Sequence, residues 1–136
     1  MDVVALIGRI LFVLLFFGSA VGHLTQSEAM AGYAASKGVP SARAATLGSG
    51  VVLVVAGLMV LLGVWADLGA LLLALFLLPT AFLMHNFWKQ TDPQARQSEM
   101  TQFNKDVSLA GGALMFFGLY AGPGADLGLT ITGPLF

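Results

Sequence analysis

Four long apolar segments constrain this chain more than any other feature. A helix of about 20 mostly apolar residues is long enough to cross the hydrocarbon core of a membrane. Residues 3–24, 46–65 and 68–88 reach this length with Arg9 as their one charged residue. The fourth segment, 103–121, reaches it only by including Asn104, Lys105 and Asp106. The sequence therefore predicts four membrane-spanning helices.

The composition agrees with lipid, and not water, as the main solvent. Hydrophobic residues make up 57% of the 136 residues and charged residues 10%, whereas soluble domains carry about 25% charged residues. A net charge of −1 provides no basic surface, so we expect no nucleic acid partner. The chain has no cysteine, which excludes thiol chemistry and zinc–thiolate sites. No phosphate-binding loop and no hydrolase motif is present.

The connections between the segments predict an all-α fold, an integral membrane four-helix bundle in one domain (1–136). Only Ala66-Asp67 joins the second and third segments, so these helices should be antiparallel neighbours. The other connections, 25–45 and 89–102, are longer, and Asp92-Pro93 in the second is read as a helix stop. Residues 122–136 have no helical pattern and predict an irregular tail. The acidic start of the chain argues against a cleaved signal peptide.

The distribution of basic residues predicts the orientation. Four crossings put both termini on one side of the membrane and the loops 25–45 and 89–102 on the other. Five of the six basic residues lie in or beside those loops. Because lysine and arginine are enriched on the cytoplasmic side, we expect both loops in the cytoplasm and both termini outside.

Arg9 lies inside the first predicted helix, where a charge is costly and marks a candidate site. One interpretation is structural: the side chain reaches toward the interface and pairs with Asp67 or Asp2. The other is functional: Arg9 anchors an anionic headgroup or a quinone carbonyl. The structural interpretation is the favoured one.

A second group of polar residues should gather at the cytoplasmic ends of the helices. Three interpretations stay open: a quinone-headgroup or proton-relay site, a single b-type haem with His23 and His85 as axial ligands, and a hydrogen-bond network that locks the helix ends. The haem is the least favoured of the three, and no other metal site is expected. The members of this candidate cofactor site are His23, His85, Asn86, Lys105 and Asp106.

Several strings of residues, in this order along the chain, resemble the DoxX family. They are Gly8-Arg9-Ile10 with Phe16-Phe17-Gly18-Ser19-Ala20, then Lys37-Gly38-Val39-Pro40, then Phe82-Leu83-Met84-His85-Asn86-Phe87-Trp88, and finally Phe103-Asn104-Lys105-Asp106-Val107-Ser108-Leu109-Ala110-Gly111-Gly112. The chain departs from the family at Asp106, where asparagine is more usual, so a Lys105–Asp106 charge pair can form.

The resemblance implies a four-helix protein of the bacterial inner membrane, with periplasmic termini in the predicted orientation. DoxX-type proteins include subunits of quinone-linked redox complexes as well as non-catalytic scaffolds. We therefore expect a small accessory subunit of a membrane redox or respiratory assembly, in contact with quinone or a partner protein at the level of His23, His85 and Lys105. The alternative is a scaffold or assembly factor. A membrane protein partner or a homo-oligomer is expected in either case.

Overall fold

The computed structural model describes residues 2–122 and 124–136, and all regular secondary structure in this part of the chain is helical. Met1 and Pro123 lie outside the described residues. The helices are α1 (Asp2–Thr25), α2 (Ser27–Ser36), α3 (Ala42–Leu62), α4 (Ala66–Met84), the 3₁₀ turn η1 (Phe87–Lys89) and α5 (Pro93–Tyr120). The predicted all-α membrane bundle is confirmed.

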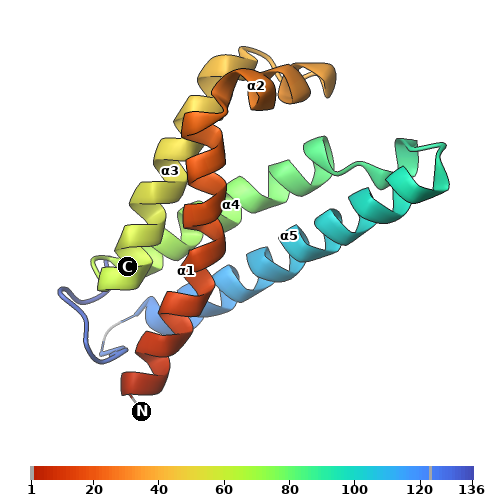
Figure 1. Cartoon of the computed structure of the whole chain (residues 1–136). Coiled ribbons are helices and arrows are strands. Elements are labelled where there is room, and N and C mark those ends of the chain that lie inside the picture. Colours follow the sequence, from red (N-terminus) through yellow and green to blue (C-terminus); the bar gives the residue numbers. More distant parts are fainter. Residues whose placement is uncertain (1, 123) are drawn as a thin grey trace.

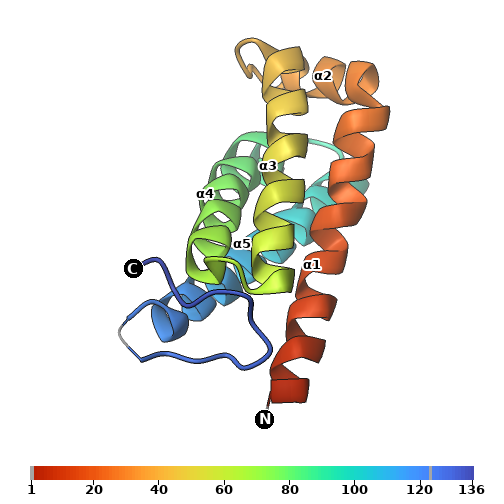
Figure 2. The same ribbon diagram turned by 90° about the vertical axis from the view of Figure 1, so that its left-hand side faces the viewer.

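The four long helices form two antiparallel pairs, α1 with α3 and α4 with α5, which diverge toward the end that carries α2 (Figures 1 and 2). Both termini lie at the opposite end (Figures 1 and 2). Small and aliphatic side chains fill the centre, where α3 and α4 meet. The fully buried members include Leu53, Ala56, Val60, Ala70 and Leu73.

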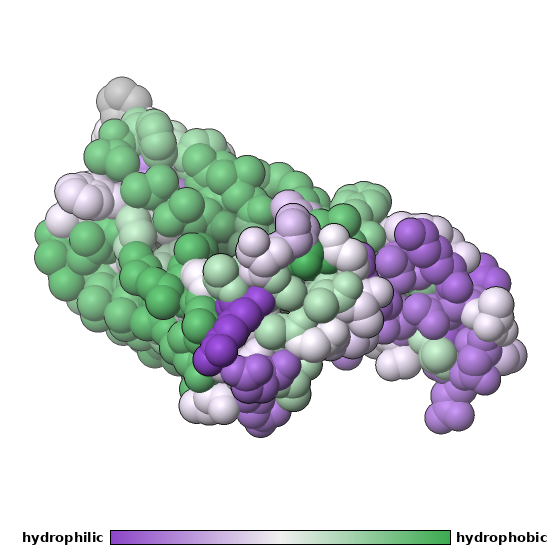
Figure 3. Space-filling model, turned by 90° about the horizontal axis from the view of Figure 1, so that it is seen from above, coloured by the Kyte–Doolittle hydropathy of each residue, from purple (hydrophilic) through white to green (hydrophobic). Residues whose placement is uncertain are grey.

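Three helical segments are long and apolar enough to cross a membrane: Asp2–Thr25, Ala42–Leu62 and Ala66–Lys89. Large apolar side chains point outward from them, with Leu11 64% and Leu75 59% exposed. Such surface is stable against lipid and unfavourable in water. Seen from above, apolar residues dominate one part of the surface, and polar residues gather over α2 and the end of the α4–α5 hairpin (Figure 3). The fourth predicted crossing, 103–121, lies in α5 and stays a prediction.

Two of the predicted loops contain helix, and the sequence interpretation of both was wrong. Residues 25–45 include α2, a ten-residue alanine-rich helix. Residues 89–102 are helical from Pro93 onward, because Asp92 and Pro93 begin α5 and do not end a helix. The Asp92 carboxylate accepts a hydrogen bond from the Ala95 backbone N–H at 2.7 Å. Proline fits a first turn because that position needs no N–H donor.

Gly122 and the C-terminal residues 124–136 are not helical, and residues 130–132 fold back over the turn between α3 and α4. The Thr132 N–H donates to the Gly63 carbonyl at 2.9 Å, and the Trp65 N–H donates to the Thr132 hydroxyl at 2.9 Å. Gly63 has a φ of +66°, and a Cβ there would lie 2.5 Å from Thr130. Only glycine therefore allows both this turn and the packing of the tail on it.

Candidate functional site

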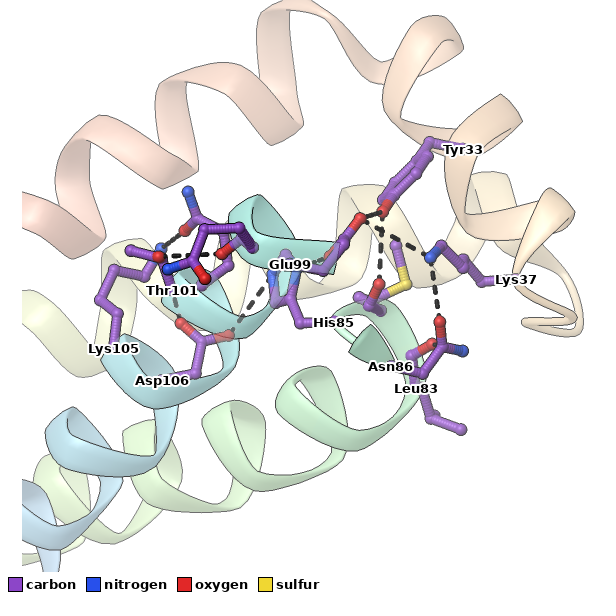
Figure 4. A network of polar contacts seen from close by, with 12 residues as sticks. Tyr33, Lys37, Leu83, His85, Asn86, Glu99, Thr101, Lys105 and Asp106 are labelled. Atoms are coloured by element: carbon purple, nitrogen blue, oxygen red, sulfur yellow. Dashed lines mark hydrogen bonds and ion pairs between the residues drawn. The ribbon is translucent and has the colours of Figure 1, made fainter. Parts of the chain in front are cut away.

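His85 follows the last residue of α4 and faces two carboxylates of α5. Its Nδ1 lies 2.8 Å from Oε2 of Glu99, and its Nε2 lies 3.6 Å from Oδ2 of Asp106 (Figure 4). Glu99 and Asp106 are seven residues apart, about two helical turns, so they share one face of α5. The imidazole therefore lies between Glu99, the outer carboxylate near the start of α5, and Asp106, the inner carboxylate near its middle.

Glu99 also holds α2 against α5. The Tyr33 hydroxyl donates to Oε1 of Glu99 at 2.7 Å, and the Lys37 ammonium lies 3.7 Å from the same oxygen (Figure 4). Burial opposes ionisation of Glu99, but hydrogen bonds from His85 and Tyr33 and the charge of Lys37 outweigh it and lower the pKa of the carboxyl. Burial, together with the hydrogen bond to Glu99, raises the pKa of the Tyr33 hydroxyl well above its usual range. Glu99 is therefore an ionised acceptor at neutral pH.

Asp106 is the more deeply buried carboxylate, with 6% of its side chain exposed, against 19% for Glu99. The Lys105 ammonium lies 3.6 Å from Oδ1 of Asp106, which is the charge pair that the sequence suggested. Lys105 also donates a hydrogen bond to Gln102. A buried carboxylate in a membrane bundle is costly unless it is paired, so this pair stabilises the ionised form.

His23, at the end of α1, belongs to the opposite pair of helices. Its Nδ1 lies 2.7 Å from the Ser49 hydroxyl and 3.2 Å from the Thr46 carbonyl, both in α3. Its ring meets Phe76 of α4 edge-on, with centroids 6.0 Å apart. These contacts fix the orientation of the ring.

A cavity of about 730 Å³ lies where the two helix pairs diverge, and residues of all five α-helices line it. Its walls are largely apolar, with Phe16, Phe76 and Leu77 among them. Its polar lining includes His23, Ser49, His85, Lys105 and Asp106. A mostly apolar pocket of this size with a few convergent polar groups is typical of a small-molecule site.

Four of the predicted site residues thus share one cavity, and two lie elsewhere. Asn86 accepts a hydrogen bond from Lys37 at 3.1 Å and donates to the Leu83 carbonyl, outside the cavity lining (Figure 4). Arg9 is buried in the N-terminal part of α1, against the C-terminal tail. Asn86 is therefore a structural link between α4 and the loop after α2.

The predicted ion pair of Arg9 with Asp67 or Asp2 is wrong. The Arg9 Nη2 donates to the backbone carbonyls of Gly128 and Leu129, at 3.2 and 2.9 Å. Asp67 instead accepts backbone N–H groups from Leu135 and Phe136. Backbone groups of the C-terminal tail are the hydrogen-bond partners of both buried side chains. No pattern in the sequence indicates these contacts.

The sequence interpretation missed Glu99, Tyr33 and Lys37 as members of the polar network. Glu99 was assigned to a loop, which hid its two-turn spacing from Asp106. Had Asp92-Pro93 been interpreted as a helix start, that spacing would have placed both carboxylates on one face. Tyr33 and Lys37 carried no comparable signal, because they meet Glu99 only through the tertiary fold.

The family model of DoxX matches residues 4–86, more than half of the chain. The chain belongs to the DoxX family. The match ends at Asn86, so His85 lies inside it while the α5 carboxylates lie beyond it.

A related protein extends the similarity over most of the chain. The inner membrane protein YphA of Escherichia coli (strain K12) is 32% identical over 123 residues, which cover 90% of this chain and 86% of the relative. No solved structure matches. Together with the apolar helices, this similarity supports an integral protein of a bacterial inner membrane.

Proposed function

We propose that this DoxX-family protein is a small accessory subunit of a quinone-linked redox assembly and that its cavity receives the quinone headgroup. The single observation that carries the proposal is the cavity of about 730 Å³, which combines apolar walls with two histidines, a lysine and a carboxylate. A quinone is an apolar ring with two carbonyl acceptors. Imidazole and ammonium groups are suitable hydrogen-bond donors to those carbonyls.

The chain's own composition supports a bound redox molecule over a protein-based redox centre. With no cysteine, the chain has neither a thiol–disulfide couple nor thiolate ligands for an iron–sulfur cluster. Any redox role must therefore pass through a bound molecule or a partner protein.

The residues do not fit the bis-histidine haem. Both ring nitrogens of His85 face carboxylates, at 2.8 and 3.6 Å, and the Nδ1 of His23 is in contact with Ser49. A haem ligand needs a free nitrogen directed at the iron. His85 could supply one only by leaving its contact with Glu99 or Asp106.

A binding titration tests the proposal. A short-tailed ubiquinone analogue is titrated into the purified protein in detergent, with wild type, His85→Ala and His23→Gln compared. We expect saturable binding to wild type and up to about tenfold weaker binding to each variant, the effect of one lost hydrogen bond. Arg96→Ala is the control, because Arg96 is on α5 but not in the cavity lining. Equal affinity for all four proteins, or no binding to wild type, would rule the quinone site out.

The second candidate is a non-catalytic scaffold or assembly factor. The observation that favours it is the polar network itself, in which Glu99 connects α2, α4 and α5 through contacts within the chain. Such a network is sufficient to lock the helix ends without any bound molecule. Purification in mild detergent that yields a stable protein partner or a homo-oligomer, with no quinone binding, would favour this role.

We also propose that both termini are periplasmic and that the segments 25–45 and 89–102 face the cytoplasm. A reporter fused to the C-terminus, active only in the cytoplasm, should stay inactive. Activity of that reporter would reverse the orientation.

A further inference from the structure

Glu99, His85 and Asp106 form a row of three proton-carrying groups, here called the carboxylate–histidine chain. It begins with Glu99, which is not part of the cavity lining, and ends with Asp106, which is. His85 joins them through its two ring nitrogens, and exposure of the side chains falls from 19% at Glu99 to 6% at Asp106. The chain thus leads from the polar end of the α4–α5 hairpin into the cavity (Figures 3 and 4).

We propose that the carboxylate–histidine chain conducts protons from the aqueous side to Asp106 and so to whatever ligand occupies the cavity. Every group on this route belongs to the protein itself. Its use, to protonate a reduced ligand in the cavity, rests on the proposed quinone function.

The transfer balances with one proton entering and one delivered. A proton from water first binds the Glu99 carboxylate. In the resting form the Nδ1–H of His85 donates to ionised Glu99, so the ring first takes up the Nε2–H tautomer. Protonated Glu99 then releases its proton to Nδ1 of His85, while the Nε2–H of the same ring passes its proton to the Asp106 carboxylate. The ring stays neutral and changes tautomer, Glu99 returns to its ionised form, and Asp106 holds the new proton.

The first contact is ready for transfer and the second must shorten. At 2.8 Å the Glu99–His85 pair is within hydrogen-bond distance, whereas 3.6 Å between His85 and Asp106 is too long. A rotation of the Asp106 side chain, or a bridging water in the adjoining cavity, closes this gap. Loss of the Nδ1 proton and gain of a proton at Nε2, both through the same water, then return the ring to the Nε2–H tautomer for the next transfer.

The surrounding groups favour the inward direction at the outer end. Tyr33 and Lys37 stabilise ionised Glu99, so protonated Glu99 is a good donor to His85. At the inner end the deeper burial of Asp106 favours its neutral, protonated form, so Asp106 is the better acceptor of the two carboxylates. His23, on α1, faces the same cavity from the opposite helix pair.

A proton-jump experiment tests the route without any quinone. A light flash releases protons from a caged compound in the buffer, and time-resolved infrared spectroscopy follows the carboxyl C=O band of Asp106. The band is assigned by its loss in Asp106→Asn, and the flash is given near the midpoint of its static titration. We expect His85→Gln and Glu99→Gln to slow the rise of this band about 100-fold, the lower end of what positioned acid–base groups contribute.

The matched control is Glu28→Gln, the same change at an exposed carboxylate of α2 that pairs with Arg43 and is not part of the cavity lining. It should keep the wild-type rate. Glu99→Asp should give a rate between those of wild type and Glu99→Gln. If His85→Gln does not fold, the comparison of Glu99→Asp with Glu99→Gln tests the route in its place. A wild-type rate in Glu99→Gln, or an Asp106 that shows no titratable C=O band, overturns the route. Neither result bears on quinone affinity, which the binding titration measures separately.

Discussion

Asp67 holds the last residues of the chain, and its replacement gives a quantitative prediction. One carboxylate oxygen, Oδ2, accepts the backbone N–H groups of Leu135 at 2.8 Å and Phe136 at 2.9 Å. Asp67 itself is fully buried at the start of α4. In Asp67→Ala, both N–H groups lose their acceptor, and we expect this end of the tail to detach.

The size of the effect follows from the charge of the acceptor. Hydrogen bonds to a charged group contribute about 1.5–3 kcal/mol each. The other carboxylate oxygen, Oδ1, is buried without a hydrogen-bond partner among the described residues, and this unfavourable burial places the estimate at the lower end. Two bonds then give about 3 kcal/mol, and since 1.4 kcal/mol is a factor of ten, the two amides should exchange about 100-fold faster.

Hydrogen exchange with mass spectrometry on the C-terminal peptide, in detergent, measures this directly. Asp67→Asn keeps one oxygen acceptor and should accelerate exchange much less than Asp67→Ala. Asp126→Ala is the control within the tail, because among the described residues the Asp126 carboxylate accepts the Gly128 N–H at 2.7 Å and no N–H of the last two residues. Exchange of the C-terminal peptide at the wild-type rate in Asp67→Ala would show that Asp67 does not hold the tail.

Three further predictions concern stability, each measured by thermal unfolding in detergent. The pKa of Glu99 is lower in the folded protein than in the unfolded chain, so its contribution is present at neutral pH and is lost as the pH falls from about 5 through the folded pKa. Wild type should therefore lose more stability than Glu99→Gln over that range. Gly69→Ala should cost about 1–3 kcal/mol, because a Cβ there would lie 2.9 Å from the Ala56 carbonyl, whereas Gly111→Ala, with open space, should cost nothing. Asp92→Ala should cost about 1 kcal/mol through loss of the α5 N-cap.

Each of these has a contrary result. Parallel acid titrations of wild type and Glu99→Gln would mean that the network around Glu99 contributes no net stability. Equal stability of Gly69→Ala and Gly111→Ala would contradict the close approach of α3 and α4. An unchanged melting temperature in Asp92→Ala would mean that the first turn of α5 does not depend on its cap.

The positions of the apolar helices could be predicted because lipid imposes a condition that each segment meets by itself. Within a membrane every backbone N–H and C=O must be bonded inside the segment, so length and hydropathy alone identify a helix. Segment 46–65 and helix α3, Ala42–Leu62, show how closely this holds. Outside the membrane the condition is absent, and there the sequence interpretation failed, at α2 and at Pro93.

The residues of the candidate site also fall into two groups, those that the sequence could place and those that it could not. His23, His85, Lys105 and Asp106 could be placed at one level because antiparallel crossings of similar length bring their ends together. Glu99 could not, because its role depends on α5 beginning at Pro93 and on α2 folding across to meet it.

The sequence by itself determined that lipid surrounds the apolar segments, that the fold is all-α, and at which end of the bundle the histidines gather. All three follow from the apolar length of each segment. Only the tertiary structure decided which groups meet: Glu99 with His85, and Arg9 and Asp67 with the tail instead of with each other. A buried polar group bonds to whatever partner the packing brings within about 3 Å, and several candidates in a sequence satisfy its chemistry equally well.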